Sequence, residues 1–274
     1  WLKILLALAA CTHSPHVLAA HPFAVAMAYL GALENVSTLK IQEKVSLIEA
    51  ASALLGQEIE MANKYKIKDR DSNQDLFYAV ETTDCCTRQL KQCLGDCAAW
   101  SLDIMYIGGG GAEQAMKMEK PWSCTVCCFN RPTVTVSDFN TGEVLGMVSD
   151  PCTCFGLTFT MKDPQENPII TANGGCCQWG ICCPLPCGPC AEVNFELQEA
   201  SSGQAIGLLK KKVPGILKWC LAPDVDNYTV RFDSNGPWDG KNKALMMAMA
   251  IFMDFRIFSE NSNDDKDDAP PQPE

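Results

Sequence analysis

Short runs of alternating apolar and polar side chains follow one another along most of the chain, a pattern typical of strands that bury one face. Tyr65 and Ile67 alternate with lysines, and after a polar turn at Asp69–Asp75 the run Leu76–Val80 predicts the return strand of a hairpin. A short helix is predicted in "SLIEAASALLG". Many short strands without long helices between them predict a mainly β sandwich or barrel. The other strand-like runs are "LKIQEKVSL", "TVTVSDF", "EVLGMVS", "FGLTFTMK", "NPIITA", "EVNFELQ", "AIGLLK" and "YTVRF".

The segment Lys243–Phe258 is the most apolar part of the chain and has no polar stripe. Its unbroken apolar run, Ala244–Met253, is 10 residues long and is followed by Asp254 and Arg256. A membrane-spanning helix needs about 20 apolar residues, whereas a helix that is apolar on every side is typical of a core. We therefore predict a closed β-barrel around a buried C-terminal helix, with membrane insertion as the alternative. The core positions predicted on this helix are Met246, Met247, Ile251, Phe252, Asp254 and Phe255.

The charge pattern divides the chain and excludes one class of partner. The chain has 274 residues and a formal net charge of −11. An acidic protein does not suit non-specific binding to nucleic acid, which needs clustered cations. Residues 261–274 are acidic and rich in proline, so we expect a disordered tail. At the other end, residues 1–32 have no assignable fold.

The chain contains 17 cysteines, several of them adjacent in the sequence. An odd number of clustered thiols in a chain long enough to build its own core favours a reducing compartment over a disulfide framework. A secreted, disulfide-rich protein that uses Leu2–Ala10 as a signal is the alternative. In "CCQWGICCPLPCGPC" irregular spacing and the lack of histidine argue for thiols rather than a zinc site. All three histidines lie before Pro22, and we find no catalytic constellation, so no enzyme activity is expected.

Five ordered motifs resemble the phospholipid scramblase family. They are "GQEIEMANKYKIKD", "ETTDCCTRQL", "PWSCTVCC", "PGILKW" with "APDVDNYTVRF", and "KALMMAMAIFMDFRIFSEN". The resemblance is collinear over residues 33–260, which would form one domain. It implies a tubby-like, closed antiparallel barrel of about 12 strands around the C-terminal helix.

The resemblance also implies a function. Members of the family move phospholipids in both directions across the plasma membrane, in response to calcium and without ATP. We therefore expect membrane phospholipids as partners and a location at the cytoplasmic face, held by a lipid anchor, the C-terminal helix or both. A hydrated path for headgroups needs more than one short helix, so a homo-oligomer is expected for transport. The alternative function is a membrane-tethered lipid-binding or adaptor module, and protein partners are not predicted.

Three groups of site residues follow from the resemblance. The Asp224–Asn235 segment would bind calcium, although its sixth and twelfth positions depart from an EF-hand, and an Asp-rich turn before a strand is the alternative. The cysteine segment would carry S-acyl chains, with plain surface thiols as the alternative. The lysine run is interpreted as a solvated strand edge or a surface for anionic headgroups. The residues are Asp224, Asp226, Thr229, Asp233 and Asn235 for calcium; Cys124, Cys127 and Cys128 for acylation; and Lys210, Lys211 and Lys212 for lipid.

Overall fold

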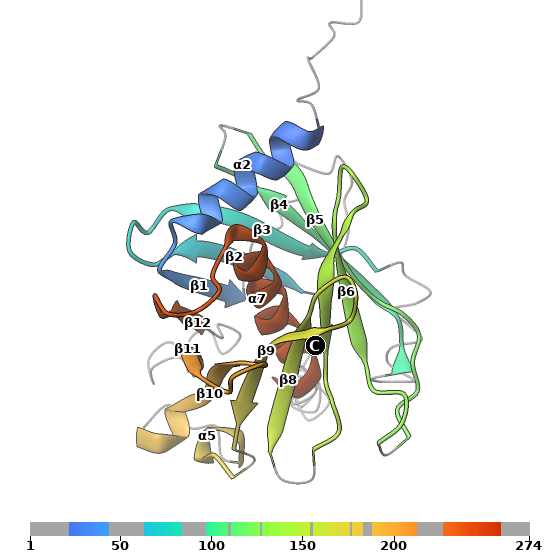
Figure 1. The fold of residues 1–274 in the computed structure, drawn as a ribbon, viewed down its shortest axis with the longest axis vertical. Helices are drawn as coiled ribbons and strands as arrows, with labels where there is room; N and C mark the ends of the chain where they lie inside the picture. Colours follow the sequence, from blue (N-terminus) through green and yellow to red (C-terminus); the bar gives the residue numbers. More distant parts are fainter. Residues whose placement is uncertain are drawn as a thin grey trace, which may run out of the picture.

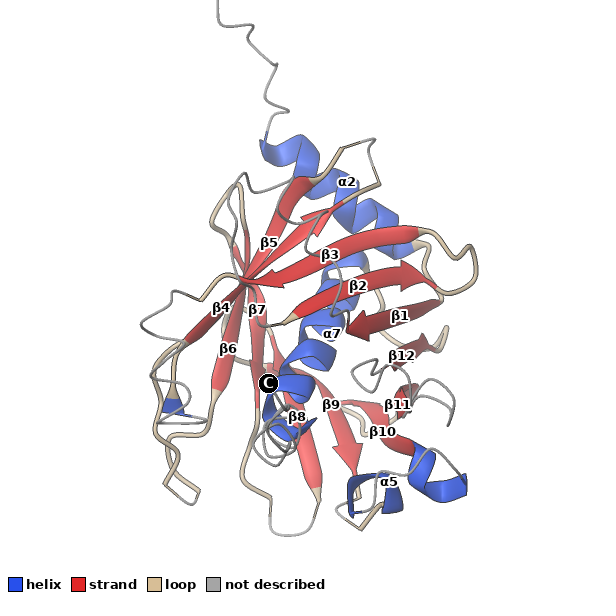
Figure 2. Ribbon diagram, turned by 180° about the vertical axis from the view of Figure 1, so that it is seen from behind, coloured by secondary structure: helices blue, strands red, loops and turns tan. Residues whose placement is uncertain are grey.

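Twelve antiparallel strands close into a barrel around a helix (Figures 1 and 2). Each strand pairs with its neighbours in the sequence, and β1 pairs with β12 to close the barrel. The mainly β fold with a closed barrel around the C-terminal helix is therefore confirmed. The computed structural model describes residues 22–43, 63–83, 97–108, 111–126, 128–153, 156–175, 177–182, 188–212 and 227–258.

Most of the strands lie where the alternation predicted them, and the predicted hairpin is formed by β2 and β3. The helix predicted in "SLIEAASALLG" lies outside the described residues, as do Val45 and Leu47 of the first run. The strands are β1 (Thr38–Glu43), β2 (Lys64–Asp69), β3 (Asp75–Glu81), β4 (Trp100–Tyr106), β5 (Glu113–Lys120), β6 (Thr133–Asp138), β7 (Val144–Ser149), β8 (Leu157–Lys162), β9 (Pro168–Gly174), β10 (Glu192–Glu199), β11 (Ala205–Lys212) and β12 (Asn227–Phe232).

The strands β4 and β5 were not predicted. In β5 the inward side chains are Met116 and Met118, separated by Lys117 and followed by Glu119. Methionine, lysine and glutamate do not favour strands by themselves. Pairing with both neighbours in a closed barrel, and burial of the two methionines, outweigh that preference.

Helix α7 (Gly240–Met253) runs through the middle of the barrel. Asp239 caps its N-terminus, because its carboxylate accepts a hydrogen bond from the Asn242 amide at 2.7 Å. Every side chain from Lys243 to Met253 is buried, which explains why its sequence has no polar stripe. Among the described residues, no helix combines the length and apolar character that crossing a membrane requires. All six predicted core positions are buried: Met246, Met247, Ile251, Phe252, Asp254 and Phe255.

Helix α2 (Pro22–Glu34) packs across one end of the barrel, so residues 22–32 belong to the folded unit (Figure 1). It approaches α7 so closely that a Cβ on Gly240 would lie 2.2 Å from the Leu30 carbonyl oxygen. The ammonium of Lys243 donates to the carbonyl oxygens of Glu34 at 2.7 Å and Val36 at 2.8 Å. The first bond satisfies a carbonyl group in the last turn of α2, which has no partner within the helix, and the second holds the segment between α2 and β1.

The two ends of the barrel differ in their connections. Because neighbouring strands are antiparallel, all odd-numbered strands end at the same rim. The end covered by α2 carries the short turns 70–74, 139–143, 163–167 and 200–204, and we call it the turn end. The opposite end carries the β5–β6, β7–β8 and β9–β10 connections and the last residues of α7, and we call it the cysteine end. The described cysteines all lie there: Cys97, Cys124, Cys128, Cys152, Cys177, Cys182 and Cys190.

Candidate functional site

The β5–β6 connection turns back on itself at the cysteine end. The backbones of Val126 and Phe129 exchange hydrogen bonds of 3.2 and 3.0 Å. Asn130 adopts a left-handed conformation with φ of 53°, and its side-chain amide donates to the Cys124 carbonyl oxygen at 2.9 Å. This geometry leaves Cys124 and Cys128 exposed. The third predicted acylation site, Cys127, lies outside the described residues.

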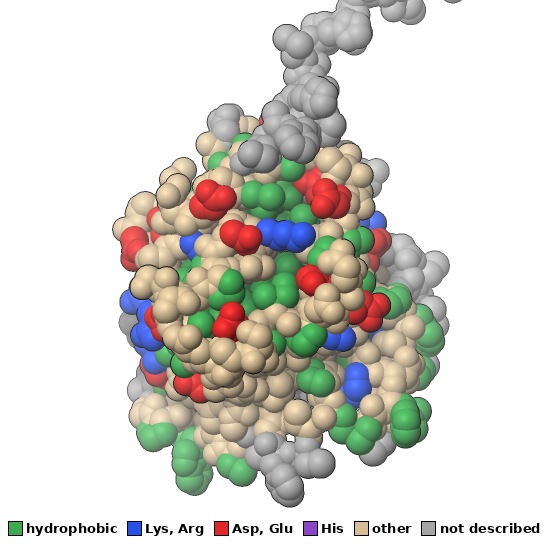
Figure 3. Space-filling model, viewed as in Figure 1, with side chains coloured by type: hydrophobic (Ala, Val, Ile, Leu, Met, Phe, Trp, Pro, Cys, Tyr) green, Lys and Arg blue, Asp and Glu red, His purple; other side chains and the backbone are tan. Residues whose placement is uncertain are grey.

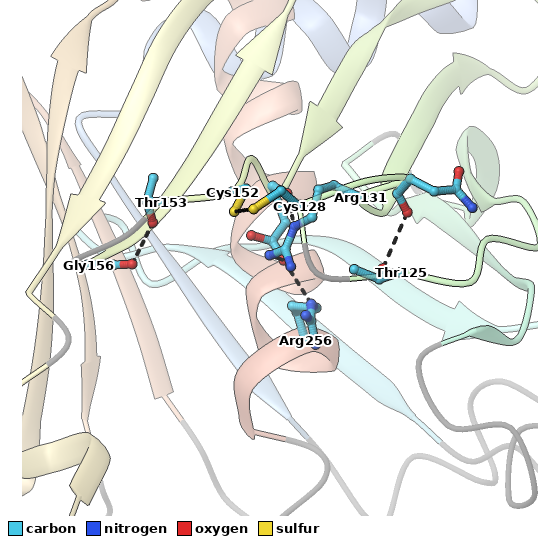
Figure 4. A network of polar contacts seen from close by, with 9 residues as sticks. Thr125, Cys128, Arg131, Cys152, Thr153, Gly156 and Arg256 are labelled. Atoms are coloured by element: carbon cyan, nitrogen blue, oxygen red, sulfur yellow. Dashed lines mark hydrogen bonds and ion pairs between the residues drawn. The ribbon is translucent and has the colours of Figure 1, made fainter.

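Both exposed cysteines have a neighbouring thiol that the sequence did not single out. The sulfur of Cys128 lies 2.7 Å from the sulfur of Cys152 on the β7–β8 connection (Figure 4). Hydrogen bonding to the Cys97 thiol raises the pKa of the Cys124 thiol. A raised pKa lowers the thiolate fraction, and the thiolate is the reactive form. Knowing that connections of alternate strands share one rim would have placed these cysteines at the same end of the barrel, but not the particular contacts between them.

One carboxylate ties the end of α7 to this rim. Asp150, just after β7, accepts from Arg131 before β6 and from the Nε of Arg256 at 2.8 Å. The Nε of Arg131 also donates to the Asp150 carbonyl oxygen at 2.9 Å. Figure 4 shows Arg256 pointing from the helix end toward Cys128, Arg131 and Cys152. Paired guanidinium–carboxylate contacts of this kind fix geometry, so the helix end and the two connections are held together.

A second carboxylate lies inside the barrel at the same end. Asp254 is the first residue of the π-helical turn η3 (Asp254–Phe258), which continues α7. Its carboxylate accepts hydrogen bonds from the hydroxyl groups of Tyr65, at 2.6 Å, and Tyr228. The ammonium of Lys211 lies 3.8 Å from the same carboxylate and 3.4 Å from the centre of the Phe258 ring. The cluster joins three strands to the end of the central helix.

Physical chemistry explains how Asp254 is tolerated there. A carboxylate at a helix C-terminus opposes the helix dipole, and burial of a charge is costly without partners. Lys211 supplies the opposite charge, and the two hydroxyl groups supply hydrogen bonds. Burial and the charge of Asp254 raise the pKa of Tyr65 well above its usual value, so this tyrosine keeps its proton and donates.

The interpretation of the lysine run as a strand edge is wrong, because β11 pairs with β10 on one side and β12 on the other. Side chains alternate along a strand, so Lys211 turns into the barrel while its neighbours turn out. Lys210 and Lys212 both pair with Glu192, at 2.6 and 2.9 Å. Of the three lysines proposed for a lipid surface, Lys211 is therefore buried.

The described part of the predicted calcium segment does not fit one ion. Thr229 lies within β12 and Asp233 just after it, which places their backbones about 13 Å apart in an extended strand, while calcium ligands lie about 2.5 Å from the ion. Asp233 pairs with the Nε of Arg231 at 3.1 Å, and Asn235 donates to the Ala205 carbonyl oxygen at 3.1 Å. Asp224 and Asp226 lie outside the described residues.

Zinc in the β9–β10 connection stays untested. Within the described ranges, no group of three His, Cys, Asp or Glu side chains is arranged to hold a metal ion. Half of the cysteines in this connection lie outside those ranges, namely Cys176, Cys183 and Cys187.

Comparison with known proteins gives one consistent result. The family model for Scramblase matches residues 19–260, from before α2 to the end of the barrel. Mouse phospholipid scramblase 1 is 26% identical over 238 residues, covering 85% of this chain and 65% of the mouse protein. Bovine phospholipid scramblase 2 is 28% identical over 230 residues, covering 82% and 70%. Human phospholipid scramblase 4 is 23% identical over 236 residues, covering 85% and 64%.

No solved structure matches the chain. The chain spans just under two thirds of the mouse scramblase 1 sequence. Because the family model covers α2, all twelve described strands and α7, the match concerns the whole barrel. The chain belongs to the Scramblase family.

Proposed function

We propose that this protein is a phospholipid scramblase-like protein that moves phospholipids in both directions across the plasma membrane without ATP. The observation that carries the proposal is the match to the Scramblase family over residues 19–260. The relatives at 23–28% identity are named phospholipid scramblases, and phospholipids are therefore the proposed partners of this chain.

The proposed location is the cytoplasmic face of the membrane, with the cysteine end toward the lipid. Cys124, Cys127 and Cys128 are the proposed acylation sites, and the exposure of Cys124 and Cys128 supports this. Each buried methylene of an acyl chain contributes about 0.8 kcal/mol, and stable anchoring takes two chains or one chain with a basic patch. The three positions could carry two chains.

The transport step needs a polar path through about 30 Å of hydrocarbon. The interior of the described barrel is filled by α7 and does not offer that path. We therefore assign transport to an assembly of several copies of the chain, in which lipid headgroups follow the contact between copies.

A membrane-tethered lipid-binding module without transport is the second candidate. It is favoured by the burial of α7 from Lys243 to Met253, since a helix that fills a barrel core is not available to the bilayer without opening the barrel. In this function the chain would bind the membrane surface through the cysteine end alone.

Calcium responsiveness is a separate part of the proposal and rests on the family resemblance. The described residues Thr229, Asp233 and Asn235 do not form one loop, so Asp224 and Asp226 are the candidates that remain. If they bind calcium, Asp224→Asn with Asp226→Asn abolishes the heat of calcium binding in calorimetry, while Asp233→Asn keeps it. Unchanged binding in the double variant would remove the site from this segment.

The test of the main proposal is lipid movement in liposomes that contain the full chain and a fluorescent phospholipid. A membrane-impermeant reductant quenches only the outer leaflet unless lipids exchange. Quenching beyond that level, measured with and without calcium, supports scrambling. Quenching that stops at the outer leaflet, with the protein confirmed on the vesicles, favours the second candidate.

A further inference from the structure

We propose that the cysteine end docks end-on onto a phospholipid bilayer by placing aromatic side chains in the headgroup region, independently of acylation. This rests on the proposed function and names the surface that meets the lipid. Most of the exposed large hydrophobic side chains of the described residues lie at this end. They are Trp122, 50% exposed, Val126, 67%, Phe129, 77%, and Trp179, 65%, whereas Phe139, 38% exposed, lies at the turn end.

The β5–β6 connection presents three of these side chains in a defined shape. The paired backbones of Val126 and Phe129 form a tight turn. Hydrogen bonds from the Asn130 amide to the Cys124 carbonyl, at 2.9 Å, and from the Thr125 hydroxyl to the Asn130 carbonyl, at 3.3 Å, brace its base. These bonds keep the connection from folding back over its own apolar side chains, so their exposure is built into the turn.

Trp179 is held outward in a different way. It begins the short helix α5 (Trp179–Cys182), and the side-chain amide of the preceding residue, Gln178, bonds the backbone of β10 in both directions. The Gln178 side chain donates to the Asn194 carbonyl oxygen at 2.8 Å and accepts from the Asn194 amide at 2.7 Å. Gly180 packs so closely that a Cβ there would lie 2.5 Å from the Glu192 carbonyl oxygen. The tryptophan is therefore fixed at the rim.

The charge distribution favours lipid as the partner. At the cysteine end, Lys210 and Lys212 both pair with Glu192. These three side chains together carry one net positive charge. Anionic leaflets attract such basic groups. Figure 3 shows several acidic side chains at the end that α2 covers, with basic and hydrophobic ones among them, and further hydrophobic side chains along the opposite margin. The acids that close the turn end are Asp69, Asp138, Asp163, Glu199 and Asp239.

The form of the apolar surface also favours a bilayer over a protein. Trp122 and Phe129 lie on the β5–β6 connection and Trp179 on the β9–β10 connection, so they come from two separate parts of the rim. Tryptophan is enriched at membrane interfaces, where its ring lies at the level of the headgroups. The exposed thiols of Cys124 and Cys128 lie beside these side chains, where acyl chains would enter the same bilayer.

The test uses the unacylated full chain, confirmed by mass, and vesicles of phosphatidylcholine with phosphatidylserine. Binding is measured by flotation for wild type, for Trp122→Ser with Phe129→Ser, for Trp179→Ser, and for Phe139→Ser as the matched aromatic control at the other end. We expect the partition coefficient to fall about tenfold in each cysteine-end variant and to stay within about twofold in the control. Quenching of tryptophan fluorescence by brominated lipids should fall with loss of Trp122 or Trp179.

Three results would overturn the proposal. The first is vesicle binding by both cysteine-end variants at the wild-type level, and the second is an equal loss of binding in Phe139→Ser. The third is a wild-type dimer in light scattering that the cysteine-end variants lose while vesicle binding persists, which would assign the surface to a second copy. Unfolding in urea checks that each variant is folded. If Trp122→Ser with Phe129→Ser does not fold, vesicle binding by Trp179→Ser alone decides the test. Aromatic-dependent binding without lipid exchange would refute transport and leave the docking surface standing.

Discussion

At the turn end, carboxylates mainly close local turns, whereas at the cysteine end they join distant parts of the chain. Asp69, Asp138 and Asp163 accept hydrogen bonds from the backbone amides that follow them and so close tight hairpins. Asp150 and Asp254 instead join residues that are far apart in the sequence and fix the end of α7. The first kind of contact is local, and the second exists only when the barrel is closed.

The difference explains how the same barrel can cover its apolar side chains at one end and expose aromatic side chains at the other. Short capped turns and α2 seal the turn end, and the apolar side chains there are mostly covered. At the cysteine end, the buried pair Lys211–Asp254 and the partly buried pair Arg256–Asp150 anchor the central helix, and the connections around it display aromatic rings and thiols. Loops on a rigid scaffold commonly carry function in this way.

The largest expected effect comes from removing the charge of Asp254. Asp254→Asn leaves the buried Lys211 ammonium without this carboxylate, and breaking a buried ion pair costs about 3–5 kcal/mol. The free energy of unfolding in urea measures the loss. Adding Lys211→Met should restore part of it, because the second charge is then also removed.

The matched control for this change lies at the turn end. Asp163→Asn makes the same chemical change in an exposed turn, where the amide oxygen still accepts hydrogen bonds from the Gln165 and Asn167 amides. We expect a much smaller loss than for Asp254→Asn. Equal losses in the two variants would refute the contrast between the two ends.

A smaller effect is expected for Asp138→Ala, which combines both kinds of contact. Its carboxylate closes the β6–β7 turn through the amides of Asn140 and Thr141. It also accepts from the buried Tyr29 hydroxyl at 2.8 Å, which ties α2 to the barrel. Leaving a buried donor without its acceptor costs about 1–3 kcal/mol.

Two measurements separate these contributions. Urea unfolding gives the total loss for Asp138→Ala, and hydrogen exchange of the α2 amides shows whether the helix loosens with it. In Tyr29→Phe the turn is intact and the donor is gone, so a milder loss is expected. A larger loss for Tyr29→Phe than for Asp138→Ala would contradict this account.

The elements of this fold that could be predicted are those marked by a pattern of side chains within the element itself. Alternation located β2, β3 and the strands from β6 to β12, and the lack of a polar stripe predicted a buried α7. β5 was missed because its methionine, lysine and glutamate carry no strand preference, and barrel closure decides their state. In β4, by contrast, Trp100, Leu102 and Ile104 alternate with other side chains, so a strand signal was present and was overlooked.

The partners of Asp254 in the internal cluster could not be predicted from the sequence alone. Asp254 was predicted to be buried, but its partners Tyr65, Lys211 and Tyr228 come from three strands that only barrel closure brings together. A signal for Lys211 was present, because the period of two places it on the same face as the apolar Leu209. No comparable local signal marks the contact between Cys128 and Cys152.

The smallest expected effect is a different response to salt of two carboxyl pKa values, one at each end of the barrel. Pairing with Lys210 and then Lys212 lowers the pKa of Glu192 at the cysteine end. Hydrogen bonds from the side chain and backbone of Asn167 and the backbone of Gln165 lower the pKa of Asp163 at the turn end. Because each folded pKa lies below the unfolded value, each group stabilises the fold above its ordinary pKa, and the contribution is lost as the pH falls through the folded pKa.

Salt acts on these two pKa values differently. The charged lysines lower the pKa of Glu192, an effect that about 1 M salt weakens at an exposed site, whereas neutral donors are the main cause at Asp163 and the charge of Lys241 is the smallest. In NMR titrations of the side-chain carboxyl carbons, the pKa of Glu192 should therefore rise with salt more than that of Asp163. Glu192→Gln should cost less than about 1 kcal/mol at neutral pH. If both pKa values responded equally to salt, the lysines would not be the cause of the lowered pKa of Glu192. The proposal that the charge of the basic group at the cysteine end attracts anionic lipid would then lose its support.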